Sequence, residues 1–292
     1  MKSSPFSFFL NKKTEIFFSF PALILIFFFI FIPILWGLYI SFTDYSLLNP
    51  SFQFIGLKNY MEVLTSYNFL KSILTTFEFM VISMLIEFPI GLGIALLLNE
   101  EFKGKKITVA LSLIPWSIPM VVNSLLWLWI YDPQYGLLNG ILYWLGIKEY
   151  NKLWLGNPQI AMFALIIADS WQVIPFHVLF FLAGLQSIPK TYYEASAIDG
   201  ANSLKRFFYI TLPLLKRVFL ILLLIRTVHC IKVFDMIYLM TNGGPGDRTT
   251  TMAFLAYLET FDHLKMSIGN TEAIIMSFIL IILGTIYIMT LY

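Results

Sequence analysis

Side chains able to bind a solute gather in two otherwise apolar stretches of the chain. The first set is Asp169, Trp171, Gln172 and His177, and the second is Arg226, His229, Cys230 and Lys232. An ionisable side chain costs roughly 2.5 to 3.5 kcal/mol at the centre of a membrane helix, so such residues are functional candidates in apolar surroundings. Asp169 and Arg226 therefore have two alternative roles: hydrogen bonding to a polar solute, or an ion pair that ties two helices together.

Residues for catalysis or metal binding do not assemble in this way. Glu194 and Asp199 are carboxylates of the kind used in acid–base chemistry, but no nucleophile or metal ligand accompanies them. The single cysteine excludes an internal disulfide, and no Cys/His cluster has metal-ligand spacing. The phosphate loop Gly-x-x-x-x-Gly-Lys-Ser/Thr is absent. We expect no catalytic residue, no metal and no cofactor in this chain.

The composition requires a bilayer as solvent. Of the 292 residues, 59% are hydrophobic and only 12% are charged, whereas a soluble domain has about 25% charged residues. The mean hydropathy is +0.80. The net charge of +2 comes without a basic tract, so nucleic acid is not an expected partner.

Six runs are long and apolar enough to span a membrane as helices. They cover residues 16–41, 69–98, 107–131, 159–186, 214–240 and 268–291. The first run is too long for a signal peptide and lacks a cleavage site, so we expect it to be retained. The sequence predicts one all-α membrane domain over 1–292.

Two acidic residues and four prolines stand out within these spans. Glu78 and Glu87 lie nine residues apart, about 900° around a helix, so we expect them to point to opposite faces. A proton relay that uses both is therefore not expected. The prolines, which are expected to break their helices locally, are Pro89, Pro115, Pro119 and Pro175.

Lysine and arginine are distributed unevenly between the two sides. With a cytoplasmic N-terminus, eleven of the 19 fall inside, six fall outside and two lie within the fifth span. The positive-inside rule therefore predicts a cytoplasmic N-terminus. The inside set is Lys2, Lys12, Lys13, Lys103, Lys105, Lys106, Lys190, Lys205, Arg206, Lys216 and Arg217.

The loop over 189–213, cytoplasmic in this orientation, is polar and patterned as two short helices. The first covers 192–198 and ends near Gly200, which can take the left-handed conformation of a helix C-cap. The second covers 203–211, with Asn202 or Ser203 as its N-cap and Pro213 as its stop. A polar loop in so apolar a chain is expected to face another protein.

This loop resembles the EAA loop of ABC importer permeases. The matching residues are Glu194, Ala195, Ser196, Ala197, Ile198, Asp199, Gly200 and Ala201, followed by Phe207, Ile210, Leu212 and Pro213. Ser196 is the one departure, since a second alanine is usual there. The resemblance implies the type I importer fold, with a coupling helix that docks on a cytoplasmic ATPase through Tyr193, Glu194, Ala195, Ser196, Ala197, Asp199, Gly200 and Ala201.

Further segments resemble the sugar branch of this family, which is related to the larger permease subunit of maltose and glycerol-phosphate systems. They are residues 54–60, 135–139, 234–235 and 241–245. The short outer loops depart from maltose permeases that carry a large periplasmic insertion. The resemblance implies a second homologous permease, an ATPase dimer that holds ATP and Mg, an external solute-binding protein and a sugar or oligosaccharide substrate.

The resemblance also implies where the sugar binds. The corresponding positions and their neighbours are Asp169, Trp171, Gln172, Val173, Phe176, Arg226, His229, Cys230, Val233 and Phe234. The spacing of Arg226, Cys230 and Val233 predicts one helical stripe. Asp169 and Arg226 are candidates for sugar hydroxyls, with Trp171 or Phe234 stacked on the ring.

Three alternative functions stay open at this point. Glycerol phosphate is an alternative cargo, for which Arg226 and Lys232 would be suitable anion partners. An ion-coupled secondary transporter would carry its proton on Asp169 or Glu87. A membrane enzyme acting on lipid-linked sugar would need catalytic carboxylates or a metal site, neither of which the sequence arranges.

Overall fold

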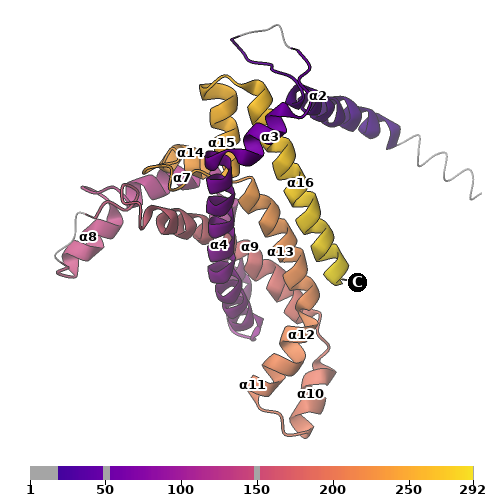
Figure 1. Cartoon of the computed structure of the whole chain (residues 1–292). Coiled ribbons are helices and arrows are strands. Elements are labelled where there is room, and N and C mark those ends of the chain that lie inside the picture. The colour runs from indigo at the N-terminus through magenta and orange to yellow at the C-terminus, as the bar shows by residue number, and fades with distance from the viewer. Residues whose placement is uncertain (1–18, 49–52, 148–151, 292) are drawn as a thin grey trace, which may run out of the picture. The chain divides into compact units, whose positions relative to one another are not determined.

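The computed structural model describes residues 19–48, 53–147 and 152–291, and these form helices joined by turns and loops (Figure 1). No β-strand occurs in these ranges beyond an isolated bridge between Thr43 and Phe54. Four helices are long and apolar enough to cross a membrane, or up to six if two bent helix pairs each count as one span. The expected all-helical membrane architecture is confirmed.

The chain divides into two compact units, which are described separately. Unit 1 comprises Met1–Thr65 and Ala256–Ile274, and unit 2 comprises Ser66–Leu255 and Ile275–Tyr292.

Unit 1 contains the first span and a short helix that packs beside its end. The span covers Ser19–Ser41 and includes the π-turn η1 (Phe27–Phe31) and α2 (Ile32–Ser41). Its predicted start at residue 16 and the lysines at 2, 12 and 13 lie outside the described residues. The side-chain amide of Asn59, in α3 (Lys58–Thr65), donates to the carbonyls of Ser41 and Thr43 at 2.8 and 2.7 Å. These bonds satisfy carbonyls left open where the span ends.

Unit 2 is built around three long helices. They are α4 (Tyr67–Asn99), α9 (Ala161–Gln186) and α13 (Lys216–Ile231). Phe181 of α9 lies between the other two, with its ring centroid 6.2 Å from Phe88 and 4.7 Å from Phe219. Contrary to expectation, Pro89 and Pro175 lie inside continuous helices.

The third span is not the single helix predicted over 107–131. Helices α5 (Lys105–Ser112) and α6 (Ile114–Ser117) are followed, after a 90° bend, by α7 (Met120–Ile130). Ile118 is extended because a residue before proline avoids the helical region, and Pro119 is the N-cap of the next helix. The amide of Gln172 donates to the Ile118 carbonyl and satisfies a group that the bend releases.

The fifth span, predicted over 214–240, also breaks. Helix α13 ends at Ile231, and a separate helix, α14 (Asp235–Met240), begins after three intervening residues. The Thr251 hydroxyl donates to the Val233 carbonyl at 3.0 Å, in place of a helical amide. Val233 is therefore outside α13, and the predicted stripe of Arg226, Cys230 and Val233 is wrong in its last member.

The polar loop forms a helical hairpin. Helix α10 (Lys190–Ile198) is followed by its C-cap Asp199 and then by Gly200, which has a positive φ of 76°. Helices α11 (Ser203–Arg206), η2 (Phe207–Thr211) and α12 (Leu212–Leu214) make the return arm, which meets α13 at a 58° bend. Pro213 lies within the arm, so the predicted stop there is wrong by about one turn, because proline is tolerated at the start of a helix such as α12.

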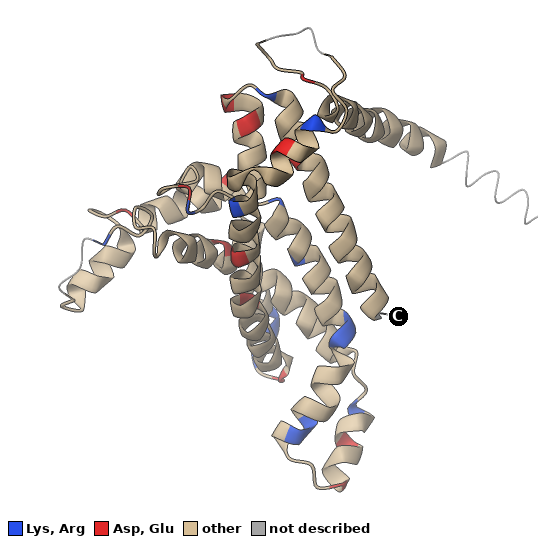
Figure 2. Ribbon diagram, in the orientation of Figure 1, with Lys and Arg blue, Asp and Glu red and all other residues tan. Residues whose placement is uncertain are grey.

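The remaining helices are the last span and three shorter helical segments. The last span is α16 (Met266–Leu291), which follows α15 (Met252–Tyr257) and the π-turn η3 (Leu258–Asp262). Helix α8 (Leu137–Trp144) follows α7. Within unit 2, the hairpin of α10 and α11 lies at the end far from α7 and α14 (Figure 1). Figure 2 shows both acidic and basic residues on that hairpin.

Candidate functional site

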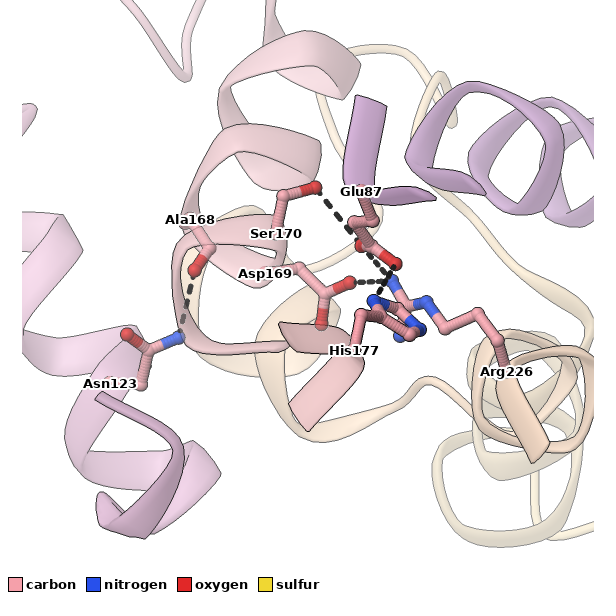
Figure 3. Close-up of polar contacts among 7 residues, drawn as sticks. All are labelled: Glu87, Asn123, Ala168, Asp169, Ser170, His177 and Arg226. Carbon is pink, nitrogen blue, oxygen red and sulfur yellow. Dashed lines mark hydrogen bonds and ion pairs between the residues drawn. The ribbon is translucent and has the colours of Figure 1, made fainter. Parts of the chain in front are cut away.

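A buried ionic cluster joins the three long helices of unit 2 (Figure 3). Nη2 of Arg226, in α13, donates to Oε1 of Glu87 in α4 at 2.7 Å and to Oδ2 of Asp169 in α9. All three side chains are buried, and Arg226 is only 3% exposed. Charges inside an apolar medium persist only when they are paired, so this cluster fixes the contacts of α4, α9 and α13.

Two further side chains of α9, Ser170 and His177, approach the Glu87 carboxylate. The Ser170 hydroxyl donates to Glu87 Oε1 at 3.0 Å, and His177 Nδ1 lies 3.8 Å from Glu87 Oε2. A Cβ added at Gly91, one turn after Glu87, would lie 2.9 Å from the Cβ of His177. The glycine therefore allows α4 and α9 to approach closely enough for the cluster to form.

Several atoms of the cluster have unused hydrogen-bonding capacity. Among the described residues, the buried atoms Glu87 Oε2, Asp169 Oδ1, His177 Nδ1 and Arg226 Nε have no hydrogen-bond partner. Buried polar atoms are normally paired, so unpaired ones call for an explanation. Asp169 Oδ1 is an acceptor and Arg226 Nε a donor, a combination that suits a hydroxyl group.

A cavity of about 350 Å³ opens beside the cluster, where α13 ends. It is lined by Met120, Asp169, Arg226, Val228, His229, Lys232, Val233, Phe234 and Asp235. Two of its side chains are acidic and two are basic, so the wall offers donors and acceptors with balanced charge. Phe234 adds an aromatic surface.

A second cavity, of about 160 Å³, shares Arg226 and His229 with the first. Its other lining residues are Trp116, Val173, Phe176, His177 and Ile225. The rings of Trp116 and Phe176 lie 5.4 Å apart. This second space is therefore mainly aromatic and apolar.

Seven of the ten residues predicted to bind substrate line these two cavities. Asp169, Arg226, His229, Val233 and Phe234 line the larger one, and Val173, Phe176, Arg226 and His229 line the smaller one.

The other three predicted residues lie elsewhere. Trp171 is 38% exposed and contacts Trp127, with ring centroids 6.1 Å apart. Gln172 bonds to the bend at Ile118, and Cys230 is fully buried.

Sequence reasoning did not include Glu87 or Ser170 in the site. The expectation that Glu78 and Glu87 face opposite ways agrees with the structure, because Glu78 instead binds Arg248. That pair is bidentate, at 2.5 and 2.7 Å. Hydrogen bonding to Glu78 raises the pKa of Arg248 above its usual value. The available signal for Glu87 was its place one turn before Gly91 in an apolar helix.

The hairpin presents its predicted coupling residues to the outside. Glu194, Ala195, Ala197, Asp199 and Gly200 are exposed, while Tyr193, Ser196 and Ala201 are half-buried. The Tyr193 hydroxyl lies 3.0 Å from that of Thr211, which ties the two arms together. At the tip, Ile198 is 87% exposed. The tip therefore combines one exposed apolar side chain with exposed polar neighbours, all of which are accessible to another protein.

Comparison with known proteins identifies the family. Residues 87–292 match the family of binding-protein-dependent transport system inner membrane components. The chain belongs to this family. It is 41% identical over 266 residues to the trehalose/maltose transport system permease protein of Thermococcus litoralis, covering 91% of this chain and 89% of that one.

Other relatives agree with this assignment. The sulfoquinovosyl glycerol transport system permease protein of Agrobacterium fabrum is 36% identical over 258 residues, with 88% of this chain and 83% of that one covered. The crystal structure of a bacterial alginate ABC transporter, in complex with an alginate pentasaccharide-bound periplasmic protein, shares the fold. Its matching chain has a TM-score of 0.83 at 22% identity, with 98% and 96% of the two chains covered.

These findings confirm the resemblance stated on the EAA residues. The chain is a multi-pass membrane protein and a permease subunit of an ABC transport system.

Proposed function

We propose that this permease carries a neutral sugar of disaccharide size, of the trehalose or maltose type, into the cytoplasm. The observation that carries the proposal is the cavity beside the break of α13, where donors and acceptors of balanced charge adjoin the Phe234 ring. A sugar needs hydrogen bonds of both kinds for its hydroxyls and a flat apolar surface for its ring face. The relationship to a trehalose/maltose permease supports this substrate class.

Seven of the predicted substrate residues have a role in this proposal. Asp169 Oδ1 accepts from a sugar hydroxyl and Arg226 Nε donates to one, after small rotations of the two side chains. His229, Val233 and Phe234 complete the polar cavity, and Val173 and Phe176 form the apolar extension. Trp171, Gln172 and Cys230 line neither cavity, so no contact with the sugar is assigned to them.

Coupling to ATP is assigned to the hairpin. A cytoplasmic N-terminus places α10 on the cytoplasmic side, where residues 193–201 dock on the ATPase. The partner set is a second homologous permease, an ATPase dimer that holds ATP and Mg, and an extracytoplasmic binding protein that delivers the sugar. The solved alginate transporter, whose structure includes a sugar-bound periplasmic protein, supports this set.

The alternative cargo, glycerol phosphate, is less well supported. Arg226 and Lys232 are cations in the cavity wall, but Asp169 and Asp235 line the same space. A divalent phosphate ester placed there would meet two carboxylates at close range, which costs binding energy. Membership of an ABC transport family also argues against an ion-coupled carrier and against a membrane enzyme.

Uptake by the reconstituted complex tests the substrate. The subunit and its genomic partners are placed in proteoliposomes with ATP inside, and entry of radiolabelled trehalose, maltose and glycerol 3-phosphate is measured with and without ATP. ATP-dependent entry of a disaccharide supports the proposal. Entry of glycerol 3-phosphate alone refutes the sugar assignment.

Co-purification tests the hairpin. Ile198→Asp puts a charge on the exposed tip and is expected to lose the ATPase from the tagged complex. Tyr135→Asp is the matched control, because Tyr135 is 90% exposed and follows α7, at the opposite end of unit 2. Equal ATPase recovery with both variants would refute docking through the tip.

A further inference from the structure

Glu87 lines neither cavity, yet it holds Arg226, one of the two residues that the cavities share. Its Oε1 accepts from Arg226 Nη2 at 2.7 Å and from the Ser170 hydroxyl at 3.0 Å. Glu87 is fully buried, so these contacts are not loosened by solvent. Glu87 and Asp169 both accept from the same nitrogen, Nη2 of Arg226, so a large rotation of the guanidinium would break a buried ion pair. Glu87 thus determines which edge of Arg226 faces the cavity.

The same contacts cancel the charge of Arg226. One guanidinium meets two carboxylates, and Lys232 and Asp235 in the wall of the larger cavity are opposite in sign. Other titratable side chains near the cluster are His177 of α9 and His229 and Cys230 of α13. The site therefore has an arginine for hydrogen bonding but no positive charge left over for an anion.

We propose that Glu87 is a positioning residue that holds Arg226 in the cavity wall and that, together with Asp169, disfavours the binding of anionic solutes. The inference rests on the proposed function and narrows it, since it assigns the cavity to uncharged sugars. Two effects are separable: the hydrogen bonds of Glu87 position Arg226, and the charge of Glu87 excludes anions.

Equilibrium binding to the assembled transporter in lipid nanodiscs tests this assignment. The probes are radiolabelled trehalose and trehalose 6-phosphate, which differ by one anionic group. Wild type is expected to bind trehalose more tightly. Glu87→Gln keeps the size of the side chain and removes its charge. The Kd for trehalose 6-phosphate divided by the Kd for trehalose is therefore expected to fall by about tenfold or more.

Two further variants make the result specific. Glu78→Gln is the matched control, because it removes the other carboxylate of α4, which pairs with Arg248 and lines neither cavity. It is expected to leave the ratio unchanged. Ser170→Ala removes the hydrogen bond that holds Glu87 while every charge remains, so trehalose affinity is expected to fall severalfold with the ratio unchanged.

The outcomes distinguish failure of the Glu87 inference from failure of the proposed function. If Glu87→Gln and Glu78→Gln give the same ratio as wild type while wild type binds trehalose, the inference fails and the proposed function survives. If Glu87→Gln does not assemble, Ser170→Ala decides the positioning role, and unchanged trehalose affinity in that variant overturns it. Wild type that binds only the phosphate, or neither sugar, overturns both the inference and the proposed function.

Discussion

Substituting alanine for Gly91 perturbs the contact on which the ionic cluster depends. The added Cβ would lie 2.9 Å from the Cβ of His177, and it would lie 3.7 Å from the Phe181 ring. The closest atom is the Cβ of His177, which is fixed to the backbone of α9. A rotation of the His177 side chain therefore cannot relieve the contact. Helices α4 and α9 must separate by several tenths of an ångström, near the point where Ser170 and His177 approach Glu87.

A matched substitution two residues away isolates the size of this effect. Gly93 lies in the same helix, and a Cβ added there meets nothing within 4 Å. Both variants gain the same helix propensity, about 1 kcal/mol from Gly to Ala, so this contribution cancels in the comparison. The remaining difference is the cost of overpacking, typically about 1 to 3 kcal/mol. We expect Gly91→Ala to be less stable than Gly93→Ala by this amount.

The chain carries its own reporter for the measurement. Cys230 is its single cysteine and is fully buried in α13, next to the cluster. Labelling of this thiol by a maleimide during a thermal ramp, quantified by peptide mass spectrometry, reports the opening of unit 2. A midpoint for Gly91→Ala that lies on the order of 5 °C below that of Gly93→Ala is expected. Coincident midpoints for the two variants would refute the close approach of α4 and α9.

Three other perturbations have expected outcomes. Arg226→Leu leaves two buried carboxylates without their cation and is expected to cost about 3 to 5 kcal/mol, seen as loss of assembled complex and early thiol labelling. Asn202→Ala removes the cap bond to the Lys205 amide (2.9 Å), worth about 1 kcal/mol, so ATPase recovery should fall while thiol labelling is unchanged. Arg248→Gln breaks a half-exposed pair worth about 1 kcal/mol or less, and limited proteolysis should cut faster within 241–251 at unchanged thermal stability.

The sequence was sufficient where a local rule decides the structure. Long apolar runs correspond to α4, α9 and α16 with ends within about two residues of the structure, because apolar length is what a bilayer requires. The hairpin was also predictable, since Asn202 caps its second helix and Gly200 takes the left-handed conformation. Both features depend on neighbours in the chain alone.

Features that depend on several helices were not predictable. Prolines gave an unreliable signal, because Pro89 and Pro175 lie in continuous helices while Pro119 marks a bend. The ionic cluster requires the rotation of three helices about their axes, and single-residue patterns do not specify it. Glu87 and Arg226 are separated by 139 positions in the chain, so their pairing is a property of the packed bundle.

The two failures of helix prediction occur at the same place in the molecule. Met120 directly follows the bend at Pro119, and Val233 and Phe234 lie in the break after α13. All three of these residues line the larger cavity. Helices α7 and α14, which begin after these breaks, pack against each other.

Irregular backbone at membrane depth is tolerated only where protein or a cavity satisfies its polar groups. Here Gln172 binds the carbonyl released at one break and Thr251 binds the carbonyl released at the other. Neither break is followed by glycine, and only one contains proline, so flexibility of the residues themselves does not account for them. The breaks are maintained by side chains from other segments, at the cost of helical hydrogen bonds. That arrangement is expected where polar groups must face a solute within the membrane, which supports placing the sugar beside Asp169 and Arg226.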